Sequence, residues 1–195
     1  QIRVLLTKSI PPWQPYVGQL GTVLPFLKST GPDPAFCRQR AAEMIGRLGP
    51  KGHIAVPDLV DSLGYSSAAL EAEHALLRVG DSSVPALIRG LRARNVDVRA
   101  HSARLLKEFV RHLSETVPPL LGALRDDASS VRREAALALG EARQVDRVLP
   151  ALFQLAKDQV AEVRAASFEA LGKLGCNSRK VLEVVRPGLR DLIPI

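Results

Sequence analysis

The chain has 195 residues, a formal net charge of +7 and an aromatic content of only 4%. This composition disfavours a β-sandwich and favours closely packed helices whose interior is filled by small aliphatic side chains. Two widely separated cysteines, Cys37 and Cys176, exclude a disulfide framework and a zinc-binding pattern. No run of about 18 apolar residues occurs, so the sequence predicts no membrane span.

The first 20 residues fit no repeat, and we predict that they form an N-terminal cap or a partial helix. Three early prolines interrupt this segment, so we expect no signal peptide there. Trp13 stands among these prolines. A tryptophan in such surroundings is expected to plug the end of a helical core rather than to face a groove.

Two degenerate helical units follow this segment. The first has Pro25, a turn at residues 31–34 and a helix from Cys37, and the second has Pro57 at the start of its first helix. Both have a proline, a turn and then an Ala-rich helix, but Ala69 occupies the place that an arginine takes in later units.

Three complete units come next, in segments that begin at Val84, Val117 and Leu149. Each unit has a proline in its second position and a Val-Arg pair at a constant distance beyond it. These positions are Pro85, Pro118 and Pro150, followed by Val98-Arg99, Val131-Arg132 and Val163-Arg164. Self-similarity at a period of this length is the signature of a helical repeat protein.

The chemistry of one unit predicts a helical hairpin. Proline is suited to the first turn of a helix, because its missing N–H costs nothing there. Helix A then carries Leu120 and Leu124 on one face, and a polar turn at 126–130 separates it from helix B, which begins near Val131. Helix B carries small inner residues that allow close packing, and we expect the glycines after it, Gly140 and Gly175, to help end it.

The segments VRREAALALGEA from Val131 and VRAASFEALGKLG from Val163 resemble HEAT-like repeats of the phycobilisome-lyase type. The resemblance implies an all-α fold, a right-handed α-α superhelix or HEAT-repeat α-solenoid. We therefore expect five hairpins in residues 21–175 and a partial repeat in 176–195. Members of this superfamily include bilin lyases, a di-iron hydroxylase, relatives of DNA-repair glycosylases and many scaffolds.

The sequence contains no recognisable catalytic motif. The di-iron relatives use His-Glu pairs, but none of the four histidines is followed by glutamate; these are His53, His74, His101 and His112. A nucleophile elbow, a phosphate-binding loop and a dinucleotide fingerprint are also missing. The resemblance permits a bilin lyase, but no residue singles out its tetrapyrrole groove. We therefore expect no catalytic residue, no metal, no cofactor and no enzymatic activity.

The repeated arginines Arg99, Arg132 and Arg164 admit two interpretations. They could form a ladder that binds phosphates, or they could hold neighbouring units together. In the family that the chain resembles, this arginine pairs with an acid or a carbonyl of the neighbouring unit. Asp126 and Asp158, each five residues before the motif valine, are the expected partners, and we favour this structural role.

The B helices are expected to line the concave face of the solenoid. Projected positions on this face carry equal numbers of acidic and basic side chains, which favours a protein partner over nucleic acid. The candidate partner-binding residues are Arg40, Arg47, His74, Arg78, His101, Arg104, Glu108, Arg133, Leu137 and Glu141. Our first hypothesis is accordingly a non-catalytic scaffold or adaptor that binds a protein on this face.

A local excess of basic residues supports a second hypothesis. The candidate anion patch comprises Arg89, Arg92, Arg94, Lys107 and Arg111, around the turn of the third unit. Several cations meeting phosphates are what sequence-independent nucleic-acid binding requires, although a solvated ridge is the simpler interpretation. A lyase-type enzyme is the third hypothesis.

Overall fold

The computed structural model describes residues 34–110 and 114–174, and in these ranges every regular element is a helix. The α-helices are α3 (Pro34–Leu48), α4 (Val56–Ser62), α5 (Ala69–Val79), α6 (Val84–Gly90), α7 (Val96–Leu106), α8 (Val117–Ala123), α9 (Ser129–Leu139), α10 (Val145–Leu155) and α11 (Ala161–Lys173). The 3-10 helices are η2 (Gly49–Ala55), η3 (Gly80–Ser83) and η4 (Ser114–Thr116). The predicted α-solenoid is thus confirmed.

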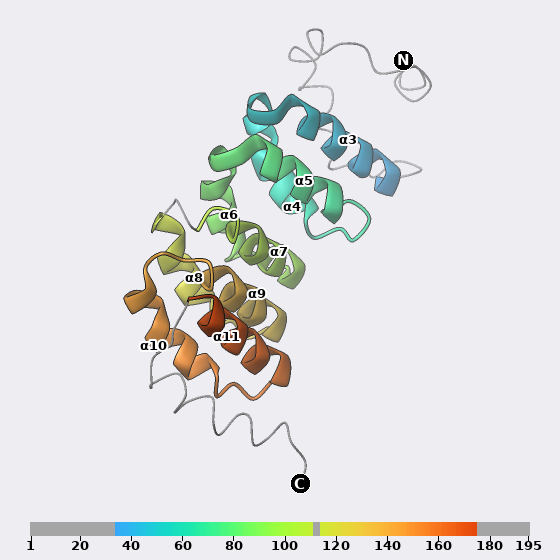
Figure 1. The fold of residues 1–195 in the computed structure, drawn as a ribbon. Coiled ribbons are helices and arrows are strands. Elements are labelled where there is room, and N and C mark those ends of the chain that lie inside the picture. Colours follow the sequence, from blue (N-terminus) through green and yellow to red (C-terminus); the bar gives the residue numbers. More distant parts are fainter. Residues whose placement is uncertain (1–33, 111–113, 175–195) are drawn as a thin grey trace, which may run out of the picture.

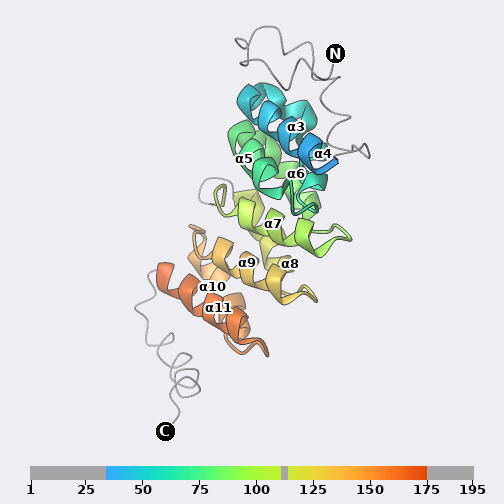
Figure 2. The ribbon, with the colours of Figure 1, turned by 90° about the vertical axis from the view of Figure 1, so that its right-hand side faces the viewer.

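The helices form two layers. The B helices α3, α5, α7, α9 and α11 follow one another down one side of the stack, and α4, α6, α8 and α10 form the other layer (Figure 1). Figure 2 shows the same succession from the side. The predicted cap at 1–20, the partial repeat at 176–195 and the first helix A lie outside the described residues, and so do Trp13 and Gly175.

Three of the A helices begin as the sequence predicts. Pro57, Pro85 and Pro118 each occupy the first turn of their helix, directly after a 3-10 segment. Pro150 is different, because α10 begins five residues earlier, at Val145, and the proline lies in its interior. There it removes the hydrogen bond that an amide would donate to the carbonyl of Asp146. The prediction that Pro150 leads its helix is therefore wrong.

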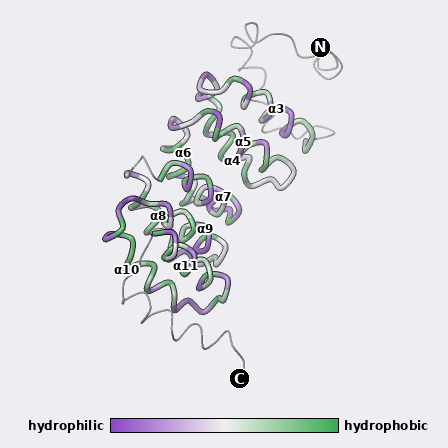
Figure 3. Tube along the Cα trace, in the orientation of Figure 1, coloured by the Kyte–Doolittle hydropathy of each residue, from purple (hydrophilic) through white to green (hydrophobic). Residues whose placement is uncertain are grey.

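The core lies between the two layers and repeats with the units. Apolar and polar residues alternate along each helix (Figure 3), so each helix buries one stripe. Each B helix buries one large aliphatic side chain almost completely: Ile45, Leu76, Leu106, Leu139 and Leu171. The A helices contribute Leu59, Leu87, Leu120 and Leu152 in the same way. The motif valines Val98, Val131 and Val163 are also buried.

Gly140, the residue after the end of α9, allows close packing against α11. Its φ of −60° is available to any residue. A Cβ built on it would lie 2.7 Å from the Cα of Ala170, so the missing side chain allows α9 and α11 to approach each other. The glycine does follow the last residue of α9 directly, as predicted, but without the left-handed conformation that makes glycine special at a helix end. Within the described ranges, no helix combines the length and the apolar character needed to cross a bilayer.

Candidate functional site

The arginines of the Val-Arg motif join successive units. Arg99 donates to both carboxylate oxygens of Asp126, from Nε at 2.8 Å and from Nη2 at 2.9 Å, and its Nη1 donates to the carbonyl of Ala93 at 3.0 Å. Arg132 repeats this geometry with Asp158 at 2.9 and 3.0 Å. Such bidentate pairing uses most of the guanidinium donors. The structural role is confirmed, and these two arginines are not exposed phosphate ligands.

The aspartates of these pairs are held in the charged form. Burial alone would raise the pKa of Asp126, but the hydrogen bonds from Arg99 and from the Ala128 amide outweigh it, so the pKa lies below its ordinary value. For Asp158 the hydrogen bonds from Arg132 are the largest influence, and they lower its pKa. Each turn thus supplies an ionised carboxylate that joins neighbouring repeats through an ion pair.

The connection differs in the N-terminal units. Arg38, at the motif position of α3, stacks on the ring of Tyr65 at 4.0 Å from its centroid, a cation–π contact with the next unit. The connection from α5 to α7 has neither member of the Arg–Asp pair, because Ala69 and Ala93 occupy their positions. The contact between α5 and α7 is also much sparser than those between the other neighbouring B helices.

A buried glutamate takes the place of the missing pair. Glu73 of α5 is only 8% exposed, and its Oε1 accepts hydrogen bonds from His101 and Arg104 of α7. The imidazole Nδ1 and the guanidinium Nη2 lie 2.9 Å apart because both converge on this oxygen. Burial would raise the pKa of Glu73, but the bonds from His101 and Arg104 outweigh it and lower the pKa.

Sequence reasoning missed Glu73, although a signal was present. The position five residues after the motif valine, or its equivalent, is a fully buried alanine in three other units, Ala42, Ala103 and Ala136, and the partly buried Phe168 in the last. A glutamate at that position predicts a buried charge, and a buried charge requires partners. The projection named both partners, His101 and Arg104, but only as exposed candidates; His101 is in fact half-buried.

A groove lies on the B-helix face between α3 and α5. Its volume is about 480 Å³, and its floor consists of Ala42, Gly46 and Ala75. The closest approach of the two helices forms this floor, since a Cβ on Gly46 would lie 3.1 Å from the Cα of Ala75. The charged and larger side chains around the floor are Glu43, Arg47, Glu71, His74, Leu77 and Arg78.

The polar side chains of the groove differ in their partners. Glu43 accepts from Arg40 at 2.5 Å and from Arg47 at 2.6 Å, and Gln39 donates to Glu71 at 2.7 Å. His74 and Arg78, one helical turn apart on α5, are exposed and have no hydrogen-bond or ion-pair partner among the described residues. They therefore differ from Glu43, Arg47 and Glu71, which each have a side-chain partner.

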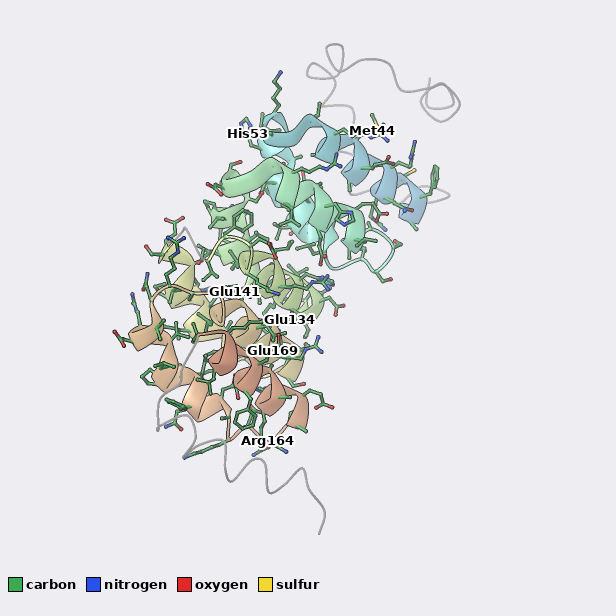
Figure 4. The ribbon with its side chains drawn as sticks, viewed as in Figure 1. Met44, His53, Glu134, Glu141, Arg164 and Glu169 are labelled. Carbon is green, nitrogen blue, oxygen red and sulfur yellow. The ribbon has the colours of Figure 1, made fainter. Side chains whose placement is uncertain are left out.

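The remaining candidates on the B-helix face do not join this groove. Glu108 is exposed in the turn after α7, and Leu137 packs partly against the core instead of standing free. Arg133 donates to its neighbour Glu134 at 2.6 Å. Figure 4 labels Glu134 on α9, Glu141 in the turn after α9 and Glu169 on α11; Lys173 pairs with Glu141 at 3.4 Å and with Glu169 at 2.8 Å.

The structure does not gather the candidate anion patch. Arg89, Arg92 and Arg94 are exposed at the end of α6 and in the turn before α7. Lys107 follows the opposite end of α7, an 11-residue helix that spans roughly 16 Å. Arg111 lies outside the described residues, as does His112. Within the described ranges, no group of three or more potential ligands could hold a metal ion.

Comparisons with known proteins identify the repeats. Residues 84–172 match the HEAT repeats family model. Over 135 residues, 68% of the chain, the sequence is 35% identical to phycocyanobilin lyase subunit beta of Thermosynechococcus vestitus (strain NIES-2133 / IAM M-273 / BP-1), and it spans 58% of the length of that relative.

Solved structures show the same relationship. One neighbour comes from the complex of CpcE and CpcF of phycocyanin lyase from Nostoc sp. PCC7120, with a TM-score of 0.63, 27% identity, and coverage of 70% of this chain and 89% of that chain. A designed armadillo repeat protein has a TM-score of 0.53 at 16% identity and covers 89% of this chain and 91% of that chain. That second likeness concerns the fold alone.

These relatives correct two expectations. The prediction of a non-catalytic scaffold and the prediction that the chain is no enzyme are contradicted, because the curated relative is a lyase subunit and the Nostoc neighbour belongs to a lyase. Neither relative supports the nucleic-acid hypothesis. The lyase was the third hypothesis because the repeat pattern carries no catalytic motif.

Proposed function

Because this chain is a HEAT-repeat protein, we propose that it is a subunit of a lyase that acts on a linear tetrapyrrole. The observation that carries this proposal is the 35% identity to phycocyanobilin lyase subunit beta over 135 residues. We propose further that it acts together with a protein partner, by analogy with the two-subunit complex from Nostoc. The substrate class is a bilin, a conjugated chain of four pyrrole rings with two propionate groups.

The groove between α3 and α5 is the proposed bilin site. Its volume of about 480 Å³ lies in the range of small-molecule pockets, roughly 300–1,000 Å³. The floor of small side chains offers a flat apolar surface for conjugated rings, and the charged rim offers partners for carboxylates and pyrrole nitrogens. These properties suit a flat, amphipathic ligand better than a bulky one.

His74 is the group placed to move a proton in this groove. Joining a protein thiol to a bilin by addition puts sulfur on one carbon of a double bond and the thiol proton on its neighbour, and elimination reverses both changes. An imidazole takes up and returns a proton near neutral pH. His74 is exposed at the groove, and its ring is not engaged with another described side chain.

The experiment combines the chain with the second subunit of the Nostoc lyase, phycocyanobilin and an acceptor phycocyanin subunit without chromophore. We expect bilin fluorescence on the acceptor that survives a denaturing gel, and none when this chain is left out. His74→Gln should slow the transfer at least tenfold, and His53→Gln, on the exposed η2 segment, should leave it unchanged. If the bilin neither binds nor is transferred, the proposal is wrong.

A further inference from the structure

The rim of the groove contains two members of a series of charged residues that runs along the B-helix face, Arg47 and Arg78. Two residues after the fully buried aliphatic side chain of each B helix stand Arg47, Arg78, Glu108, Glu141 and Lys173. Neighbouring members of this series reach each other across the face, as the 3.4 Å contact between Lys173 and Glu141 shows. Glu141, just after α9, and Lys173, the last residue of α11, have opposite charges and neutralise each other.

On α3 and α5 the two neighbours have the same charge. Arg47 and Arg78 both line the groove. Glu43 compensates Arg47 and is shared with Arg40, whereas Arg78 has no ion-pair partner in the described part of the chain. The two carboxylates of the same lining, Glu43 and Glu71, already accept hydrogen bonds from Arg40, Arg47 and Gln39. Arg78 is therefore the cation at this rim that is left to pair with an anionic group of a ligand. The groove therefore favours a ligand that brings negative charge to this rim.

The rest of the groove limits the shape of that ligand. Below the arginines lies the floor of Ala42, Gly46 and Ala75, and Leu77, 39% exposed, stands beside it. A ligand that fits both parts has a flat apolar body and carboxylates that project from one edge. A guanidinium can hold a carboxylate through two parallel hydrogen bonds.

We propose that Arg47 and Arg78 form a clamp for the propionate groups of the bilin and so fix its orientation over the floor. This inference rests on the proposed function and extends it by naming the groups that position the substrate. The clamp leaves the conjugated edge of the bilin next to His74, which precedes Arg78 by one turn on the same helix. A substrate held in one orientation presents the same double bond to the acceptor thiol each time.

The test compares free phycocyanobilin with its dimethyl ester, in which both carboxylates are masked, by titrating bilin absorbance with protein. Exposed ion pairs predict about a fivefold loss of affinity for each arginine replaced, and about a 25-fold weaker binding of the ester to the unchanged chain. The Arg47→Ala/Arg78→Ala double variant should bind acid and ester equally. Arg78→Lys should recover part of the loss.

Lys173→Ala is the matched control, because it removes a cation at the equivalent position of α11 and should not change bilin affinity. Equal binding of acid and ester by the unchanged chain, or an equal loss in the control, overturns the clamp and leaves the lyase proposal standing. Failure of the unchanged chain to bind bilin overturns both. A double variant that loses the partner subunit but keeps its bilin affinity assigns the arginines to a protein contact and overturns the clamp.

Discussion

Arg99 of α7 and Asp126, in the turn before α9, are joined by two parallel hydrogen bonds of 2.8 and 2.9 Å. Their side chains are 15% and 13% exposed, so this pair is well shielded from water. The carbonyl of the same Asp126 accepts a hydrogen bond from Arg132 of its own unit at 2.8 Å. One residue therefore ties three segments of the solenoid together.

Replacing Asp126 by asparagine should lower the free energy of unfolding by about 1–3 kcal/mol, because it leaves a shielded guanidinium without its anion. Urea unfolding followed by circular dichroism measures this. Arg133→Gln is the control, since it removes an ion pair whose cation is 48% exposed and should change stability by less than about 1 kcal/mol. Equal losses in both variants would contradict the assignment.

Acid should weaken the solenoid through the same pairs. Both Asp126 and Asp158 have a lowered pKa in the folded state. For Asp126, burial raises the pKa but the hydrogen bonds from Arg99 outweigh it. For Asp158, the hydrogen bonds from Arg132 are the largest influence. Their contribution is therefore complete above the ordinary value of 3.8 and is lost as the pH falls through the folded-state values. The Arg99→Ala/Arg132→Ala variant should be less stable than the unchanged chain at pH 6. It should also lose less stability than the unchanged chain between pH 4 and pH 2. Parallel curves of urea midpoint against pH would refute this.

Glu73→Gln should loosen the junction between α5 and α7. The substitution keeps the size of the side chain but leaves His101 and Arg104 without their shared anion, and we expect a loss of about 1–3 kcal/mol. Hydrogen exchange should accelerate at the amides of α5 and α7 more than at those of α9 and α11. Glu108→Gln, which changes an exposed carboxylate in the turn after α7, should have little effect. A uniform acceleration along the chain would argue against a local role.

Gly140→Ala should destabilise the protein although alanine favours helices. The new Cβ would lie 2.7 Å from the Cα of Ala170, a clash that corresponds to about 1–3 kcal/mol. Gly172→Ala on α11 is the matched control, because nothing lies within 4 Å of its Cβ position; it should stabilise by up to about 1 kcal/mol. The thermal midpoints of the two variants should therefore move in opposite directions.

The sequence predicted the features that repeat. The motif valines are buried and Arg99 and Arg132 pair with the expected aspartates, because spacing along a helix fixes which face a residue occupies. Pro150 was misplaced because the same rule assumed that every proline begins a helix. Residues 145–149 instead form an additional first turn of α10. In the two preceding units the corresponding segments are the 3-10 helices η3 and η4.

The candidate site was predicted only in part. Counting along the helices identified Arg47, His74 and Arg78 on the B-helix face, and all three line the groove. Counting gives no distance between helices, so the groove itself, the burial of His101 and the partnership with Glu73 were not predicted. Within the candidate anion patch, the length of α7 separates Lys107 from Arg89, Arg92 and Arg94, and Arg111 lies outside the described residues.

The missing Arg–Asp pair between α5 and α7 has a consequence for how the chain responds to stress. In a solenoid each unit is stabilised mainly by its neighbours, so cooperativity is transmitted only as strongly as the weakest interface. Here the polar connection across that interface is a single buried carboxylate, while the units beyond it are joined by two bidentate pairs. Residues 34–83 and 84–174 should then melt as two blocks, with the groove confined to the first. Loss of the groove would precede loss of the repeats that follow it.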